Sequence, residues 1–301
     1  MSGLLSLQLT IFLLIALGFI FRKLNLVTES GQKSLTNLVL YLVLPCNIFT
    51  AFIGKYTMDM LYRCGLILLI SLAIQAFAVL YGKIFFRHKE EGVRKCLEYG
   101  IICSNAGLLG NPIAEGVYGT EGLMLASVYL IPQRIMMWSF GLASFSGSRD
   151  WKATWLKVIK HPCIIATFAG ILLMLTQYTL PDLIMDPIEI IGRCNTALSM
   201  MVIGMILSEI NPRDLIDRDT VSYTVQRLIL IPALIYIVCL LFHCNHLVTG
   251  LSVLLASMPA GATTPMLASK YDINPHFATK MVVFSTLCSI PTIIIWSYIL
   301  R

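Results

Sequence analysis

Ten apolar stretches follow one another along the chain, separated by short polar connections. Each is close to the ~20 residues that a helix needs to cross the hydrocarbon core of a bilayer. By residue number they cover 4–21, 35–53, 61–85, 97–118, 123–145, 162–179, 188–207, 223–242, 247–270 and 277–300. The pattern predicts an all-α membrane protein with ten transmembrane helices.

The fourth stretch is interrupted between Ser104 and Glu115 by glycines, asparagines and a proline, Gly110 among them. Inside a membrane, unwound backbone is tolerated only where protein or a watery cavity covers it. Asn111 before Pro112 is predicted to cap a helix that starts again in mid-membrane. The positive end of that helix would point into the protein, which makes it a predicted anion site.

The ninth stretch is interrupted in the same way over residues 257–265, through Pro259, Gly261 and Pro265. A shift of 153 positions places Asn111 on Thr264, and a proline follows each of them. Corresponding interrupted helices in two halves of a chain indicate a transporter built from inverted repeats, with its site near the midplane. The halves are residues 1–145 and 162–301, joined by a charged linker at 146–161. Because five spans is an odd number, the two halves enter the membrane in opposite orientations.

Lysine and arginine fix the predicted orientation. With the N-terminus outside, sixteen of them fall in inside connections and three (Lys55, Arg63 and Arg301) in outside ones. This bias is typical of a multi-pass protein with both termini outside the cytoplasm, here in the cell (inner or plasma) membrane.

Composition narrows the class further. Hydrophobic residues make up 57% of the chain and charged residues 13%, whereas a globular domain carries about 25% charged residues. The net charge of +6 therefore reflects membrane orientation, and no nucleic-acid partner is predicted. The nine cysteines contain no CxxC pair, and neither a metal site nor a cofactor is expected. HExxH, GxGD and GxSxG motifs are absent, so we do not expect an enzyme.

Several motifs resemble those of a known family. They are Ser104-Asn105 through Gly110-Asn111-Pro112 to Gly119, Met258-Pro259 through Pro265 to Asp272, Leu44-Pro45, and Gly204-Met205-Ile206-Leu207. Over nearly its whole length the chain is similar to the auxin efflux carriers and their bacterial relatives. The resemblance implies two inverted five-helix repeats, broken crossing helices 4 and 9, a scaffold of spans 1, 2, 6 and 7, and a moving transport domain of spans 3–5 and 8–10. It also implies a homodimer and organic anions, such as auxin or small dicarboxylates, as substrates.

The resemblance assigns Asn105 to the asparagine that contacts the substrate carboxylate in the plant carriers. The chain departs from those carriers in lacking their long central loop and in having Glu115 where they place a lysine. Both departures point away from auxin and toward a compact permease of bacterial type.

Other polar residues inside the spans are candidates for the site, each with an alternative. Asn111 and Thr264 cap the restarted helices, and the neighbouring N–H groups bind substrate. Arg134, near the centre of span five, balances an anionic substrate or pairs with Glu115. Gln133 lines the cavity or bonds between helices.

Three further residues carry open alternatives. Glu115 either complements the dipole of the restarted helix or is protonated during transport. Asn47 is a candidate to face the site from the scaffold. Arg193 and Arg227 lie close enough to span ends to extend toward the interface.

The leading hypothesis is a secondary transporter for a small organic anion, with lipid as its surroundings. The alternative is a sodium- or proton-coupled carrier of the same fold, although no acidic pair marks a buried cation site. Substrate identity, the direction of flux and the coupling ion do not follow from the sequence.

Overall fold

The computed structural model describes residues 2–53, 57–146, 159–178, 180–208 and 215–300. Over these residues the chain is helical and contains no strand. The helices are α1 (Ser2–Lys23), α2 (Glu29–Leu38), α3 (Leu44–Thr50), α4 (Met58–Phe85), α5 (Glu91–Ile102), α6 (Asn111–Met136), α7 (Leu142–Ser146), α9 (Pro162–Thr176), α10 (Asp182–Arg193), α11 (Asn195–Leu207), α12 (Arg218–Val225), α13 (Ile231–Leu241), α14 (His246–Ala256), α15 (Thr263–Lys270) and α16 (Pro275–Ile299). Four π-helical turns join some of them: η1 (Val39–Val43), η2 (Ala106–Gly110), η3 (Met137–Gly141) and η5 (Gln226–Leu230).

Four helical stretches in the described part of the chain are long and apolar enough to cross a membrane: Met58–Phe85, Asp182–Leu207, Arg218–Leu241 and Pro275–Ile299. Polar caps in the connections start several helices. The side chains of Thr28, Thr57, Asp217 and Asn274 each accept a hydrogen bond from a backbone N–H of the first turn. Helices of this kind agree with a membrane protein. Most of the predicted linker, residues 147–158, lies outside the described residues.

Three of the π-helical turns have the same cause. Each ends one residue before an X-Pro pair, and the residue before the proline donates its N–H to the carbonyl five positions back: Leu44 to Val39, Asn111 to Ala106 and Ile231 to Gln226. Proline lacks an N–H and its ring clashes with the carbonyl four positions back. One wider turn removes that clash and keeps the helix going. These prolines therefore bend helices and do not end them.

Gly119 marks the bend between the fourth and fifth predicted spans. It has φ 68° and ψ −161° within α6, a conformation that side-chain-bearing residues rarely adopt. The helix before this bend holds residues 106–118, and the helix after it continues through η3 and α7.

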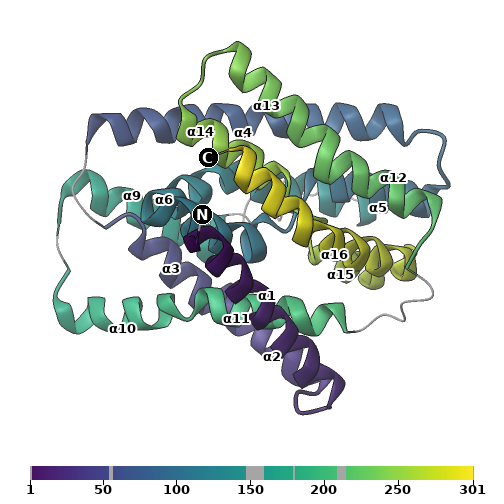
Figure 1. Cartoon of the computed structure of the whole chain (residues 1–301), viewed down its shortest axis with the longest axis horizontal. Coiled ribbons are helices and arrows are strands. Elements are labelled where there is room, and N and C mark those ends of the chain that lie inside the picture. Colours follow the sequence, from purple (N-terminus) through teal and green to yellow (C-terminus); the bar gives the residue numbers. More distant parts are fainter. Residues whose placement is uncertain (1, 54–56, 147–158, 179, 209–214, 301) are drawn as a thin grey trace.

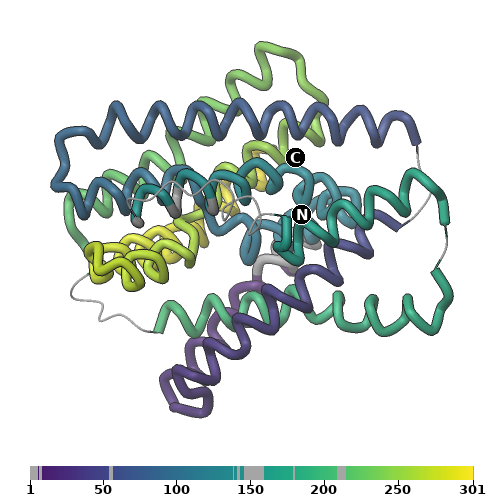
Figure 2. The backbone as a smooth tube through the Cα atoms, turned by 180° about the vertical axis from the view of Figure 1, so that it is seen from behind, coloured from purple at the N-terminus to yellow at the C-terminus, as the bar shows by residue number. Residues whose placement is uncertain are grey.

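The helices pack as two groups. α1 lies against α11, and α3 lies against α9 and α10. Gly18 and Gly204 let α1 and α11 approach closely, because a Cβ on Gly204 would stand 1.9 Å from the Ile15 carbonyl oxygen. In the other group α4, α5, α6 and α12–α16 contact one another. Figure 1 shows α10 and α11 on the opposite side of the molecule from α4, with α6 and α16 between them, and Figure 2 shows the same order from behind.

Candidate functional site at the crossing of two interrupted helices

Two interrupted helices meet in the middle of the molecule. α5 ends at Ile102 and α14 ends at Ala256, and a short non-helical segment follows each of them. Ser104 and Ala260 form an antiparallel bridge. The Asn105 N–H donates to the Pro259 carbonyl at 2.8 Å, and the Gly261 N–H donates to the Cys103 carbonyl at 3.0 Å. We call residues 103–105 and 257–262 together the crossing.

Side chains from neighbouring helices satisfy the backbone of the crossing. Gln133 of α6 donates from Nε2 to the Ser104 carbonyl at 2.8 Å and accepts from the Ser104 hydroxyl at 3.1 Å. The Ala260 N–H donates to Ser285 Oγ of α16 at 3.2 Å. Buried backbone groups need such partners, since leaving one unpaired costs about 1–3 kcal/mol. Gln133, predicted from sequence to line the cavity or to bond between helices, makes the second kind of contact.

Arg227 of η5 is a buried charged residue that donates hydrogen bonds to backbone carbonyls of both interrupted helices. Its side chain is 4% exposed. Nε donates to the Met258 carbonyl at 3.0 Å and Nη1 donates to the Ile101 carbonyl at 2.9 Å. The Ile101 carbonyl belongs to the last turn of α5, where acceptors lose their helical partners and a positive charge is favourable. The prediction that Arg227 extends from a span end toward the interface is therefore wrong.

Two helix starts leave the crossing on opposite sides. η2 begins at Ala106 next to α14, and α15 begins at Thr263 next to α5. The first N–H groups of a helix have no partner within it, and they carry its positive end. Gly107, in the first turn of η2, is only partly buried, and a Cβ built on it would meet nothing within 4 Å. Open space thus lies beside a helix start, as an anion site requires.

The predicted restart at Asn111-Pro112 is wrong by five residues. The helix resumes at Ala106, directly after Asn105, and we call residues 106–118 the resumed helix. Asn111 already has helical angles (φ −60°, ψ −50°). Gly110 and Pro112 are therefore inside the resumed helix and not in the break. The cause is the π-helical turn η2, whose wider geometry accommodates Pro112 without ending the helix.

The second restart is also earlier than predicted. α15 begins at Thr263, and the Thr264 hydroxyl donates to the Gly261 carbonyl at 2.8 Å, so Thr264 does not act as the predicted cap. Pro265 lies in the first turn of α15, where a missing N–H costs nothing. Pro259 and Gly261 lie in the break itself, as predicted.

Two polar side chains near the crossing have unpaired atoms. Asn111 is fully buried, and among the described residues neither its amide nitrogen nor its amide oxygen has a hydrogen-bond partner. Arg134 is buried as well, and its Nη1 has no partner. The alternative in which Arg134 pairs with Glu115 is wrong, because the two form no ion pair and Glu115 has another partner.

That partner is Asn47. Its amide nitrogen lies 3.4 and 3.3 Å from the two carboxylate oxygens of Glu115. Asn195 of α11 donates to the Asn47 amide oxygen at 2.9 Å, and Ser199 donates to Asn195 at 3.0 Å. A chain of hydrogen bonds thus joins α11 and α3 to the resumed helix that follows the crossing. Asn47 and Glu115 lie together, away from the backbone contacts of the crossing.

The contacts of Arg227 were not predicted from the sequence, because span eight was predicted to begin at residue 223. The helical stretch begins five residues earlier, at Arg218, after the cap Asp217. Asp217-Arg218-Asp219-Thr220 carries the ordinary signature of a helix start, an acidic cap and an acidic first turn. Reading that signature would have placed Arg227 well inside the span.

In the part of the chain that the structure describes, no three His, Cys, Asp or Glu side chains gather in a way that could hold a metal ion.

Comparison with known proteins relates the chain to membrane transporters. The chain is 24% identical to a transporter of Methanocaldococcus jannaschii, over 97% of both chains, and 22% identical to a transporter of Escherichia coli, over 97% of this chain and 96% of the other. It is 21% identical to a protein of Rhizobium meliloti named "Putative malonate transporter", over 100% of this chain and 97% of the other. A family model described as membrane transport protein matches residues 5–297. The chain therefore belongs to this family of membrane transporters, which is that of the auxin efflux carriers its motifs resemble.

Proposed function

We propose that the protein is a secondary transporter for a small organic anion, and that the anion binds at the crossing. The observation that carries the proposal is the start of two helices at one point inside the protein, with open space beside Gly107. Backbone N–H groups and two positive helix ends stabilise a carboxylate there. Arg227 adds a positive charge beside the crossing, with its guanidinium held on carbonyl oxygens.

The substrate class follows from this chemistry. A site made of N–H groups recognises carboxylate and accepts no cation. The relative named "Putative malonate transporter" supports a small dicarboxylate. Asn105 lies directly before the first helix start, Asn111 lies one turn further along the same helix with its amide unpaired, and Thr264 lies at the other start. Arg134, with its unpaired Nη1, balances the charge of the anion.

The architecture of the transporter is part of the proposal. Ten membrane helices form two inverted repeats, with both termini outside the cytoplasm of a cell-membrane homodimer. α1, α2–α3, α9 and α10–α11 are the scaffold, and the helices grouped around the crossing carry the substrate across it. The close packing of α1 on α11, and of α3 on α9 and α10, supports this division. Alternating access needs two states of similar free energy.

Uptake of labelled malonate and related dicarboxylates into proteoliposomes tests the proposal. Gly107→Leu fills the open space at the helix start without backbone strain, and we expect it to abolish uptake while the protein remains folded. Gly65→Leu is the matched control, since Gly65 also has nothing within 4 Å of its missing Cβ but lies on α4. Asn105→Ala should lower uptake at least tenfold. Normal uptake by Gly107→Leu would place the substrate elsewhere.

A proton-coupled mechanism is the second candidate, favoured by Glu115. This carboxylate lies where the resumed helix contacts α3, and it bonds Asn47 of the proposed scaffold. Uptake driven by a pH jump without sodium would support it. Uptake that requires a sodium gradient would favour a sodium symporter.

A further inference from the structure

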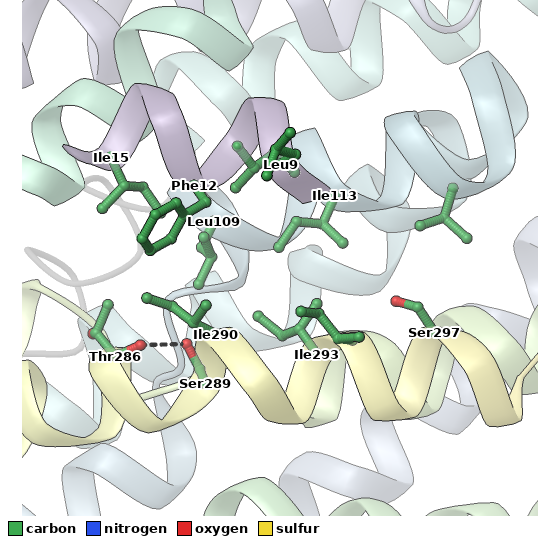
Figure 3. Close-up of a pocket in the computed structure, with 13 residues that line it drawn as sticks. Leu9, Phe12, Ile15, Leu109, Ile113, Thr286, Ser289, Ile290, Ile293 and Ser297 are labelled. Atoms are coloured by element: carbon green, nitrogen blue, oxygen red, sulfur yellow. Dashed lines mark hydrogen bonds between the residues drawn. The ribbon is translucent and has the colours of Figure 1, made fainter. Parts of the chain in front are cut away.

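A cavity lies between α1, α16 and the resumed helix. Its volume is about 220 Å³. Leu9, Phe12 and Ile15 of α1 face Ile293 of α16 across it, and Leu109 and Ile113 close it from the side, as Figure 3 shows. The lining is apolar except for three hydroxyl groups.

The three hydroxyl groups differ in their hydrogen-bond partners. Thr286 donates to the Val282 carbonyl, and Ser289 donates to the Thr286 carbonyl, so both are satisfied by their own helix. The Ser297 hydroxyl is buried and has no hydrogen-bond partner in the part of the chain that the structure describes. A water at the Ser297 end would need two to four polar partners, but Ser289, the nearer of the other two hydroxyls, is eight residues away along α16, about 12 Å. The lining therefore suits an occupant that is apolar along most of its length and carries a hydrogen-bond acceptor at the Ser297 end.

The rim of the cavity is apolar and exposed. Leu9 is 62% exposed and Phe12 is 49% exposed, and Ile294 on the other side is exposed too. Exposed apolar side chains of a membrane protein contact lipid tails. A lipid acyl chain is therefore the occupant that this opening suits.

The depth of Ser297 matches the position of a lipid ester group. Ser285 of α16 contacts the crossing through Ala260. Ser297 is twelve residues further along, about 18 Å at 1.5 Å per residue. Half of the hydrocarbon core is about 15 Å. With the crossing at the midplane, as the proposed function has it, Ser297 lies at the edge of the core while the cavity extends inward to Thr286.

We propose that this cavity binds one acyl chain of a membrane phospholipid, with the ester carbonyl accepting a hydrogen bond from the Ser297 hydroxyl. The chain lies between α1, which packs on α11, and α16 with the resumed helix. It therefore fills the space between the proposed scaffold and the proposed transport domain, and its presence affects how the two move past each other.

Photo-crosslinking tests the site without measuring transport, so its failure is separate from a failure of the proposed function. The purified full chain is placed in nanodiscs that contain a trace of a diester phospholipid with a diazirine on one acyl chain, and labelled peptides are mapped by mass spectrometry. We expect label on α1 and α16 well above that on the lipid-exposed face of α4. Ile290→Phe, at the partly exposed wall, should lower it several-fold, whereas Ile295→Phe, exposed on α16 outside the cavity, should not.

The ester contact is tested with Ser297→Ala and with a dialkyl ether lipid that lacks the carbonyl. One neutral hydrogen bond corresponds to a roughly threefold to tenfold preference. We expect wild-type protein to prefer the diester probe by this factor and Ser297→Ala to lose the preference. Three results would overturn the proposal. The first is labelling of α1 and α16 no greater than that of α4, and the second is labelling that Ile290→Phe leaves unchanged. The third is equal retention of ester and ether lipids by the wild-type protein. Protection of these peptides in a dimer would overturn it too, because a second copy would then cover the cavity.

Discussion

Single buried polar side chains hold the crossing, and each acts on backbone atoms that the helix breaks set free. Gln133 pairs with both the carbonyl and the hydroxyl of Ser104. Ser285 accepts from the Ala260 N–H. Arg227 donates to carbonyls of both interrupted segments, Ile101 and Met258. The breaks exist because these residues satisfy groups that a continuous helix would have paired by itself.

Arg227→Met tests this role. The substitution keeps much of the side-chain volume but leaves the Ile101 and Met258 carbonyls unpaired. Each unpaired carbonyl costs about 1–3 kcal/mol, so we expect a thermal unfolding midpoint several degrees lower in detergent. Arg193→Met is the control, because Arg193 is exposed and its contact is an ion pair with Glu189 one turn away. Equal midpoints for the two variants would show that Arg227 does not hold the crossing.

His161 gives a prediction on pH. Burial, and second the positive charge of Arg134, lower the pKa of His161 to about 4. The unfolded value is about 6.5, so the neutral form contributes stability above pH 6.5 that is lost as pH falls toward 4. The loss is about 3 kcal/mol at most. The neutral ring also accepts the Cys163 N–H at the start of α9.

Thermal unfolding at pH 7.5 and 4.5 checks this. His161→Asn keeps an N-cap acceptor without a titrating group, and we expect it to lose less stability than the wild type over this range. An identical loss in both proteins would assign the pH dependence to other groups.

At the residue scale, part of the site could be predicted. A polar residue within a span, such as Gln133 or Asn105, was found because it is costly there unless it has a partner. Its partner could not be found, since Gln133 and Ser104 are 29 positions apart. Asn111 was assigned as a cap because the local signature of a cap and of a π-helical turn before proline is the same.

At the scale of elements, prolines bend the helices while Gly119 and the crossing redirect the chain. Both breaks were readable because clusters of Gly, Pro and Asn are strong signals, and apolar length indicated the four described stretches that could cross a membrane, predicted as spans three, seven, eight and ten. The π-helical turns η1, η2 and η5 were not readable, since a proline in a span is compatible with either a stop or a bend. Tertiary packing decides between them.

Gly119→Ala tests the bend. At φ 68° and ψ −161° a residue with a Cβ is strained by about 1–3 kcal/mol, although nothing lies within 4 Å of the added atom. We expect a lower unfolding midpoint. Gly65→Ala, inside the straight helix α4, should be neutral or stabilising by about 0.5–1 kcal/mol. A midpoint unchanged by Gly119→Ala would mean that the bend is not under strain.

At the scale of the whole molecule, the two helix groups touch where the resumed helix meets α3 and α11. Asn47 and Glu115 form a polar contact there, and Asn195 and Ser199 support it from α11. The sequence identified both Asn47 and Glu115 as candidates, but the only partner that it suggested for Glu115 was Arg134, as one of two alternatives. The correct partner is 68 positions away and belongs to the other helix group.

Glu115 gives a prediction for transport as a whole. The ionised carboxylate accepts from Asn47, and a hydrogen bond to a charged group is worth about 1.5–3 kcal/mol against about 0.5–1.5 for a neutral one. Protonation therefore loosens the contact between the two groups and favours their relative movement. Glu115→Gln is neutral at every pH, so we expect uptake at pH 7.5 to resemble that of the wild type at low pH and to lose its pH dependence. Glu121→Gln is the matched control, because Glu121 lies on the same α6 but pairs with Arg63 of α4. A Glu115→Gln protein that keeps the wild-type pH profile would show that the carboxylate only complements the helix start, where its charge is favourable at any stage of the cycle.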